Sequence, residues 1–110
     1  MIKISKKNSL FKLEMLILLS LKNGDYYGYE ISQLIKEKTN GIFEIKEGVM
    51  YPLLHSLLDS GHITSFEKIV NRRIRVYYHI EEKGRVYLSQ LFEDFNNKVA
   101  ILQRLNDEER

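Results

Sequence analysis

Apolar residues recur along the first half of the chain with the spacing of helices. The first predicted helix covers Leu10 to Lys22, is apolar almost all round, and has Asn8 or Ser9 as its N-cap. Asp25 is expected to cap a second helix over Tyr26 to Lys38. Glycine follows each of these stretches closely, as is typical of helix C-termini. A helix that is apolar on every side indicates burial against several neighbours.

A third helix is predicted from Glu47 to Ser60, with Gly61 as its stop. Pro52 is expected in or near the first turn, where the missing N–H of proline is tolerated. The inner side of this helix carries Met50, Leu53, Leu54, Leu57 and Leu58. The opposite side carries Gly48, Tyr51, Pro52, His55 and Asp59. This helix therefore has one apolar side and one side available to a partner.

From Ile63 onward the helical spacing gives way to alternation. Ile74, Val76, Tyr78 and Ile80 alternate with Arg75, Tyr77 and His79, which predicts a half-buried strand. The β-rich segment Ile63 to Val70 is expected to pair with it, and Asn71, Arg72 and Arg73 form the tip of the resulting hairpin.

The last segment, Glu82 to about Leu105, again has helical spacing and would be about 36 Å long. Such a helix is too long to pack wholly against so small a body, so a partner helix is expected. The predicted dimer surface combines residues of the first and last helices. Its members are Leu13, Ile17, Leu88, Leu91, Phe95, Val99, Leu102 and Leu105.

Three helices, a hairpin and a long helix define the predicted fold. This order is that of a winged helix-turn-helix, a mainly α fold with a small β component (α+β). We expect residues 1–80 to form a DNA-binding domain and residues 81–110 to form the dimerisation helix. The chain is thus predicted to act as a homodimer.

Composition narrows the classes of function only modestly. The chain of 110 residues has no cysteine, which excludes disulfides and thiolate metal sites. Its net charge is +2, but residues 1–80 hold 12 Lys and Arg against 8 Asp and Glu. No segment has the roughly 20 apolar residues that span a bilayer, and no signal peptide is evident. A cytoplasmic protein without membrane contact is expected.

The residues with potential for DNA contact gather on the third helix and the hairpin tip. Polar side chains near the start of a recognition helix reach base edges in the major groove, and a basic hairpin suits phosphates or the minor groove. The alternative for both features is an ordinary solvated surface. The predicted contacts to a pseudo-palindromic DNA site are Tyr27, Lys46, Gly48, Tyr51, His55, Asn71, Arg72 and Arg73.

Three segments together resemble the PadR family of transcriptional regulators. They are Tyr27 to Ile31, Gly48 to His55, and Tyr77 to Ile80 followed by Glu82-Lys83-Gly84-Arg85. The resemblance implies a repressor released by a small molecule, in a short subfamily that dimerises through one C-terminal helix. Two positions depart from the family pattern, since Ser56 replaces a common arginine and Glu81 replaces a common threonine.

Two other functions remain open from the sequence. A small aromatic effector could lie between Met15, Phe92 and Phe95. Membership of the core explains these residues better, and the chain has no tryptophan to stack on an effector. The winged helix could also serve protein contacts, with weak or no DNA binding.

An enzyme, a cofactor and a metal site are not expected. No glycine-rich phosphate loop or catalytic carboxylate pair is evident. His62 and His79 could meet across the hairpin, but no third metal ligand accompanies them.

Overall fold

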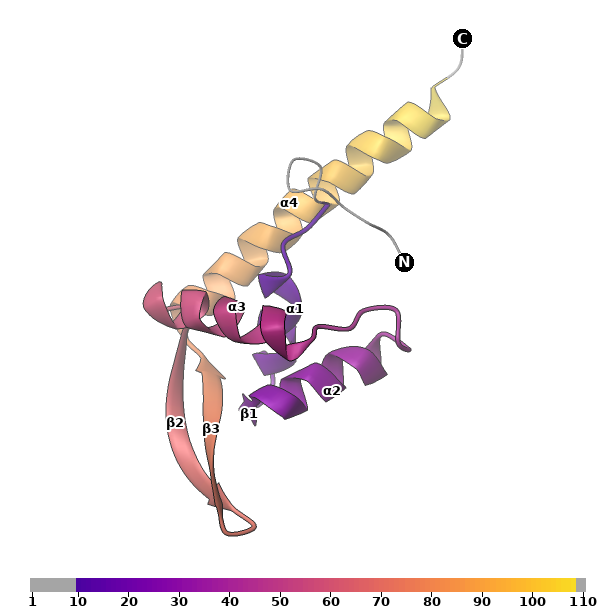
Figure 1. The fold of residues 1–110 in the computed structure, drawn as a ribbon. Helices are drawn as coiled ribbons and strands as arrows, with labels where there is room; N and C mark the ends of the chain where they lie inside the picture. The colour runs from indigo at the N-terminus through magenta and orange to yellow at the C-terminus, as the bar shows by residue number, and fades with distance from the viewer. Residues whose placement is uncertain (1–9, 109–110) are drawn as a thin grey trace.

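The computed structural model describes residues 10–108. Its elements are α1 (Glu14–Leu21), β1 (Tyr26–Tyr27), α2 (Gly28–Lys38), α3 (Glu47–Asp59), β2 (Ile63–Val70), β3 (Arg73–Ile80) and α4 (Glu82–Asp107). The strands form one antiparallel sheet in the order β1-β3-β2 (Figure 1). The predicted winged helix with a long C-terminal helix is confirmed.

The core forms around α1, which contacts α2, α3, α4 and the sheet. Ile17 and Leu18 are completely buried, and Leu21 nearly so. Because α1 is apolar on every side, each of its faces can be covered by a different element. This arrangement fixes the positions of α3 and the hairpin relative to one another.

The first helix is shorter than its apolar run predicts. It begins at Glu14 instead of Leu10, and its N-cap is Leu13, which makes no side-chain capping bond. The predicted caps, Asn8 and Ser9, lie outside the described residues. Ahead of the helix, the ring of Phe11 packs edge-on against Phe43 and Phe95, with centroids 5.5 and 6.1 Å away. The residues predicted to form the first helical turn are therefore not helical, and Phe11 packs against other parts of the chain.

The predicted start of the second helix at Tyr26 was also wrong. Tyr26 and Tyr27 form β1 and pair with Tyr78 and Tyr77 of β3. Asp25 does not cap the helix, because the N-cap is Tyr27, whose backbone N–H donates to Glu30 Oε1 at 3.2 Å. Asp25 Oδ1 instead accepts a hydrogen bond from His79 Nδ1 at 2.7 Å. The helix begins at Gly28.

Two further expectations about local structure were wrong. Pro52 lies in the second turn of α3, not in or near the first. On β3 the side that was predicted to be buried is buried only in the half of the strand nearest α4. Ile80 and Tyr78 are buried, whereas Val76 and Ile74 are 42% and 66% exposed. Tyr77, expected to point outward, is buried, since it packs against Tyr27 and Phe66. The outer half of the hairpin therefore stands away from the core.

The first turn of the long helix α4 packs closely against the hairpin at Gly84. A Cβ atom at Gly84 would collide with the carbonyl oxygen of His62 and lie 2.9 Å from the Ile80 side chain. Glycine is thus required for the contact that connects α4 to the start of β2. From there α4 runs away from the domain, and the molecule measures 65 × 28 × 23 Å.

Candidate nucleic-acid interface

The two predicted sides of α3 are confirmed. Met50, Leu54 and Leu57 are buried in the core, with Leu53 and Leu58 packed against it. Gly48, Tyr51, Pro52, His55 and Asp59 are all exposed. Tyr51 and His55 lie one helical turn apart on this outer side, with Gly48 one turn before Tyr51 and hence at the helix start.

Tyr51 is held in place by the start of α2. A Cβ atom at Gly28 would lie 2.8 Å from the Tyr51 hydroxyl oxygen, so the missing side chain of Gly28 makes room for the Tyr51 ring. Burial raises the pKa of Tyr78 above its ordinary value, and the neighbouring Tyr51 raises it further. Tyr51 therefore packs at the contact of α2 and α3 while remaining 42% exposed.

Gly48 serves a different purpose. Nothing lies within 4 Å of the position that its Cβ atom would occupy. No contact within the described chain thus requires glycine here, and the space stays open to an external backbone. Lys46, the exposed N-cap of α3, adds a cation to the positive end of the helix dipole.

The hairpin ends in a two-residue turn that presents cations. Asn71 and Arg72 have φ angles of 53° and 66°, as in a type I′ turn. Arg73 was predicted in the tip but belongs to β3, where it pairs with Val70. Asn71, Arg72 and Arg73 are all exposed. Because positive φ disfavours arginine, Arg72 places a cation where glycine would be easier to accommodate.

Tyr27 lies in an aromatic cluster on the outer side of the sheet. Its ring lies 5.5 Å from that of Tyr77, and the Arg75 guanidinium lies 4.9 Å from its centroid. On the far side of Tyr77 the ring of Phe66 is stacked at 5.6 Å, and Lys68 Nζ lies 5.2 Å from the Tyr77 centroid. Arg75 and Lys68 were missed from the sequence, although their paired positions follow from the hairpin register.

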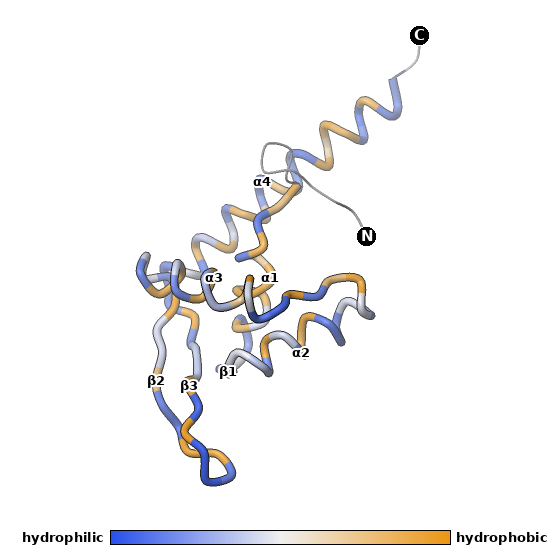
Figure 2. The backbone as a smooth tube through the Cα atoms, viewed as in Figure 1, coloured by the Kyte–Doolittle hydropathy of each residue, from blue (hydrophilic) through white to orange (hydrophobic). Residues whose placement is uncertain are grey.

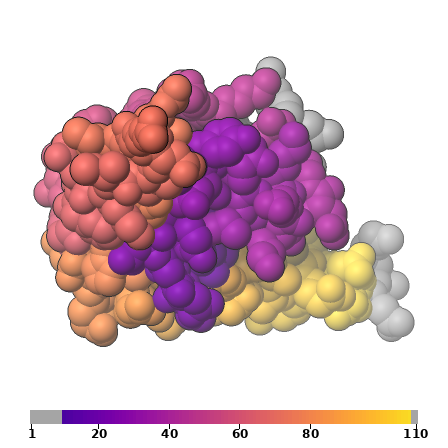
Figure 3. Space-filling model, turned by 90° about the horizontal axis from the view of Figure 1, so that it is seen from below, coloured from indigo at the N-terminus to yellow at the C-terminus, as the bar shows by residue number. Residues whose placement is uncertain are grey.

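The hairpin and α2 lie beside each other on one face of the molecule (Figure 3). Their adjacency comes from β1, which joins the start of α2 to β3. Tyr27 is therefore paired with the hairpin through Tyr77, and Tyr51 packs against Gly28 at the start of α2.

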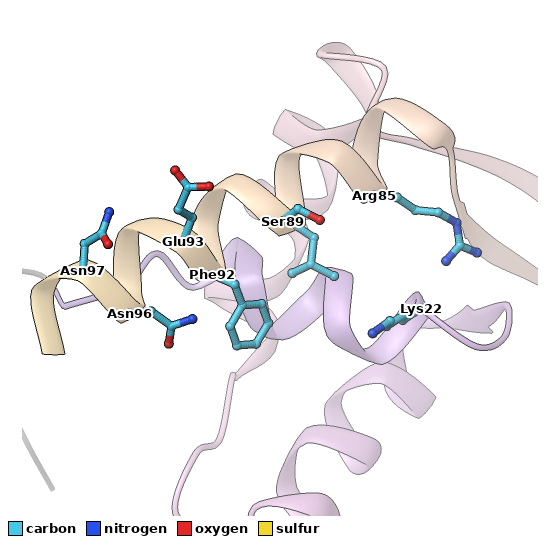
Figure 4. A pocket seen from close by; sticks show the side chains of 8 residues that line it. Lys22, Arg85, Ser89, Phe92, Glu93, Asn96 and Asn97 are labelled. Atoms are coloured by element: carbon cyan, nitrogen blue, oxygen red, sulfur yellow. The ribbon is translucent and has the colours of Figure 1, made fainter. Parts of the chain in front are cut away.

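The tentative effector residues do not line a common pocket. Met15 is 5% exposed and belongs to the core, and Phe95 packs against Phe11. Only Phe92 lines an open groove of about 540 Å³ between the end of α1 and α4 (Figure 4). Lys22 and Arg85 lie at one end of this groove, and Asn96 and Asn97 line it further along α4.

The predicted dimer residues divide into two groups. Ile17 is fully buried and Leu88 is 5% exposed, so neither has a surface for a second chain. Leu91 and Phe95 are half-buried. The exposed members are Leu13, Val99, Leu102 and Leu105, at 41%, 40%, 55% and 66%.

The two hairpin histidines do not converge. His62 Nδ1 lies 2.6 Å from Ser60 Oγ and its ring stacks on Tyr87, whereas His79 pairs with Asp25. Among the described residues no three metal-ligating side chains gather. In that same part of the chain, no helix is both long and apolar enough to cross a membrane.

The geometry defines a winged helix-turn-helix protein with an exposed third helix and a basic hairpin. The model of the transcriptional regulator PadR-like family matches residues 17–90. The chain belongs to this family, and it is a transcriptional regulator and not an enzyme.

Several individual proteins are similar to this chain. "Uncharacterized protein X" of Lysinibacillus sphaericus is 36% identical over 91 residues, which are 82% of this chain and 84% of that protein. A transcriptional regulator from Clostridium thermocellum is 33% identical with a TM-score of 0.78, covering 84% of this chain and 90% of the other. Bacillus subtilis PadR, solved in complex with operator DNA, is 29% identical with a TM-score of 0.66. That match covers 71% of this chain and 44% of PadR.

Proposed function

We propose that this chain is a homodimeric, sequence-specific DNA-binding repressor. The observation that carries the proposal is the exposed side of α3, where Gly48, Tyr51 and His55 follow one another from the helix start. Side chains there reach base edges when the N-terminal part of a recognition helix enters the major groove. The operator complex of B. subtilis PadR supports this use of the fold.

The hairpin and Lys46 supply the sequence-independent contacts. Arg72 and Arg73 extend beyond the body at the hairpin tip, and Lys46 immediately precedes α3. Phosphate contacts of this kind position a protein on the duplex without reading its sequence. Residues 1–80 would then act as the DNA-binding unit. Tyr27 contributes mainly by packing, since its ring is covered by Arg75 and Tyr77.

Residues 81–110 would hold the dimer together. Hydrophobic positions recur along the outer half of α4 (Figure 2), and Val99, Leu102 and Leu105 are exposed at helical spacing. A second α4 packed along this stripe would remove it from water. Two copies related by a two-fold axis would present their α3 helices to half-sites about 34 Å apart.

Tyr51→Phe and His55→Ala are expected to change which base pairs are preferred. A side chain that contacts a base discriminates by about 1 to 3 kcal/mol, or roughly 5- to 150-fold at that position. Tyr51→Phe keeps the ring packed against Gly28 and removes only the hydroxyl. Binding would be measured by fluorescence anisotropy against duplexes with single base changes.

Asp59→Asn is the matched control, because Asp59 is exposed at the far end of α3. Its preferences should equal those of the wild type. If Tyr51→Phe and His55→Ala lower affinity equally on every duplex, these residues do not read bases.

We further propose that release from DNA depends on a small aromatic molecule bound in the groove between α1 and α4. Phe92 supplies apolar surface beside the buried Leu88, and Lys22 and Arg85 supply charge at one end. A ligand that binds only the folded state raises the melting temperature. Planar aromatic compounds should therefore shift it, and Phe92→Ala should reduce the shift. No shift from any compound, with the dimer intact, would argue against an effector here.

A further inference from the structure

The hairpin exposes an apolar pair directly behind its basic tip. Ile69 and Ile74 are cross-strand partners and are 73% and 66% exposed. They lie on the same side of the sheet as Ile63 and Ile80, which are buried in the core. Hydrophobic positions on both strands are visible just above the hydrophilic turn (Figure 2). Val76, on the same side, is 42% exposed and extends the apolar surface toward the body.

The hairpin that carries this apolar pair is rich in cations. Between residues 67 and 75 the chain has four, Lys68, Arg72, Arg73 and Arg75, against the single acid Glu67. Arg72 and Arg73 lie at or next to the turn. Lys68 and Arg75 lie on the opposite side of the sheet, over the rings of Tyr77 and Tyr27, and Glu67 lies on the side of the isoleucines. A partner that encloses the tip and both sides of the hairpin must therefore combine negative charge with apolar surface. A second copy of the hairpin would bring like charges together, which disfavours that arrangement.

The minor groove of DNA has the required chemistry. Its rims are phosphates, and its walls are the apolar faces of deoxyribose. Proteins that bind there combine arginine or lysine with apolar side chains that enter between base steps and bend the duplex. Side chains opposite each other on paired strands have Cβ atoms about 5 Å apart, so Ile69 and Ile74 form a single wedge.

We propose that the Ile69–Ile74 pair enters the DNA minor groove behind the Arg72-Arg73 tip and bends the duplex. The inference rests on the proposed DNA-binding function, and adds to it an apolar contact that is independent of charge. The minor groove of B-DNA is about 6 Å wide, so a two-stranded hairpin must widen it to enter. Sequence preference at this position then comes from how easily the duplex deforms.

The test compares Ile69→Thr/Ile74→Thr with the wild type on a duplex selected from a randomised library. Threonine keeps the β-branch that suits strands and removes part of the apolar surface. The double variant should bind at least about tenfold more weakly. The slope of log affinity against log salt should stay unchanged, because no phosphate-binding cation is lost. The bend angle, measured by electrophoresis of permuted fragments, should decrease.

Ile42→Thr is the matched control, since Ile42 is 75% exposed in the segment between α2 and α3. It should bind and bend DNA as the wild type does. The wild type also gives a readout that needs no variant, because it should bend the selected duplex.

The outcomes that contradict the inference can be told apart from one another. A straight duplex with the wild type, or equal affinity and bending with the double variant, overturns the apolar wedge and leaves DNA binding intact. Loss of self-association with unchanged bending would identify the pair as a contact between copies. A wild type that binds no duplex at low salt contradicts the proposed function itself, and the inference with it.

Discussion

Replacing Leu102 and Leu105 with glutamate is expected to convert the proposed dimer to monomers and to lower operator affinity by about a hundredfold or more. Both side chains are more than half exposed in one chain. In the proposed dimer they are covered, and burial of a leucine contributes about 1.5 to 3 kcal/mol. Four carboxylates, two from each chain, would face one another instead. A monomer contacts only one half-site and therefore loses most of the affinity.

Sedimentation analysis would give the mass of the variant, and fluorescence anisotropy its affinity. The fold should persist, because neither leucine belongs to the core of one chain. Asn97→Glu/Ala100→Glu adds the same charge to exposed positions on the other side of α4 and should stay dimeric. A Leu102→Glu/Leu105→Glu protein that remains a dimer would place the interface elsewhere.

Replacing both Arg72 and Arg73 with alanine is expected to weaken binding to every duplex by a similar factor. If both arginines contact phosphates, the slope of log affinity against log salt should flatten by about 2, since each phosphate contact contributes about 0.9. The loss should be largest at low salt. Because phosphates carry no sequence information, the order of preference among duplexes should not change.

Lys36→Ala/Lys38→Ala is the control, because it removes the same charge from the exposed C-terminal end of α2. Its salt slope should remain close to that of the wild type. An equal flattening in the two double variants would mean that overall charge, and not contact at the hairpin tip, controls binding. An unchanged slope in the arginine variant would remove the tip from the phosphate contacts.

The order of the elements could be predicted from the sequence because it depends on local spacing. Helical and alternating patterns locate α3 and the hairpin, and the outer side of α3 follows directly from its apolar positions. β1 could not be found in this way. It consists of two residues whose partners, Tyr77 and Tyr78, lie about fifty residues further along the chain. Pairing over such a distance has no signature in the flanking residues.

Part of the predicted dimer surface is buried within one chain, for a related physical reason. Periodicity shows that one side of a helix is apolar. It does not show whether the same chain or a second chain covers that side. Ile17 and Leu88 are covered by their own chain, whereas Leu102 and Leu105 are not. The same ambiguity placed Met15 in an effector site, although it belongs to the core. The exposure of Ile69 and Ile74 could not be predicted either, because the outer half of the hairpin extends away from the core. That extension is a property of the tertiary structure and not of the local sequence.

Selection of binding sites from a randomised duplex library tests the central claim most directly. A dimer that reads DNA through two α3 helices should enrich inverted repeats. The centres of their half-sites should be about 10 base pairs, one helical turn, apart. Enrichment of single asymmetric sites, or no enrichment at low salt, would contradict a dimeric DNA reader.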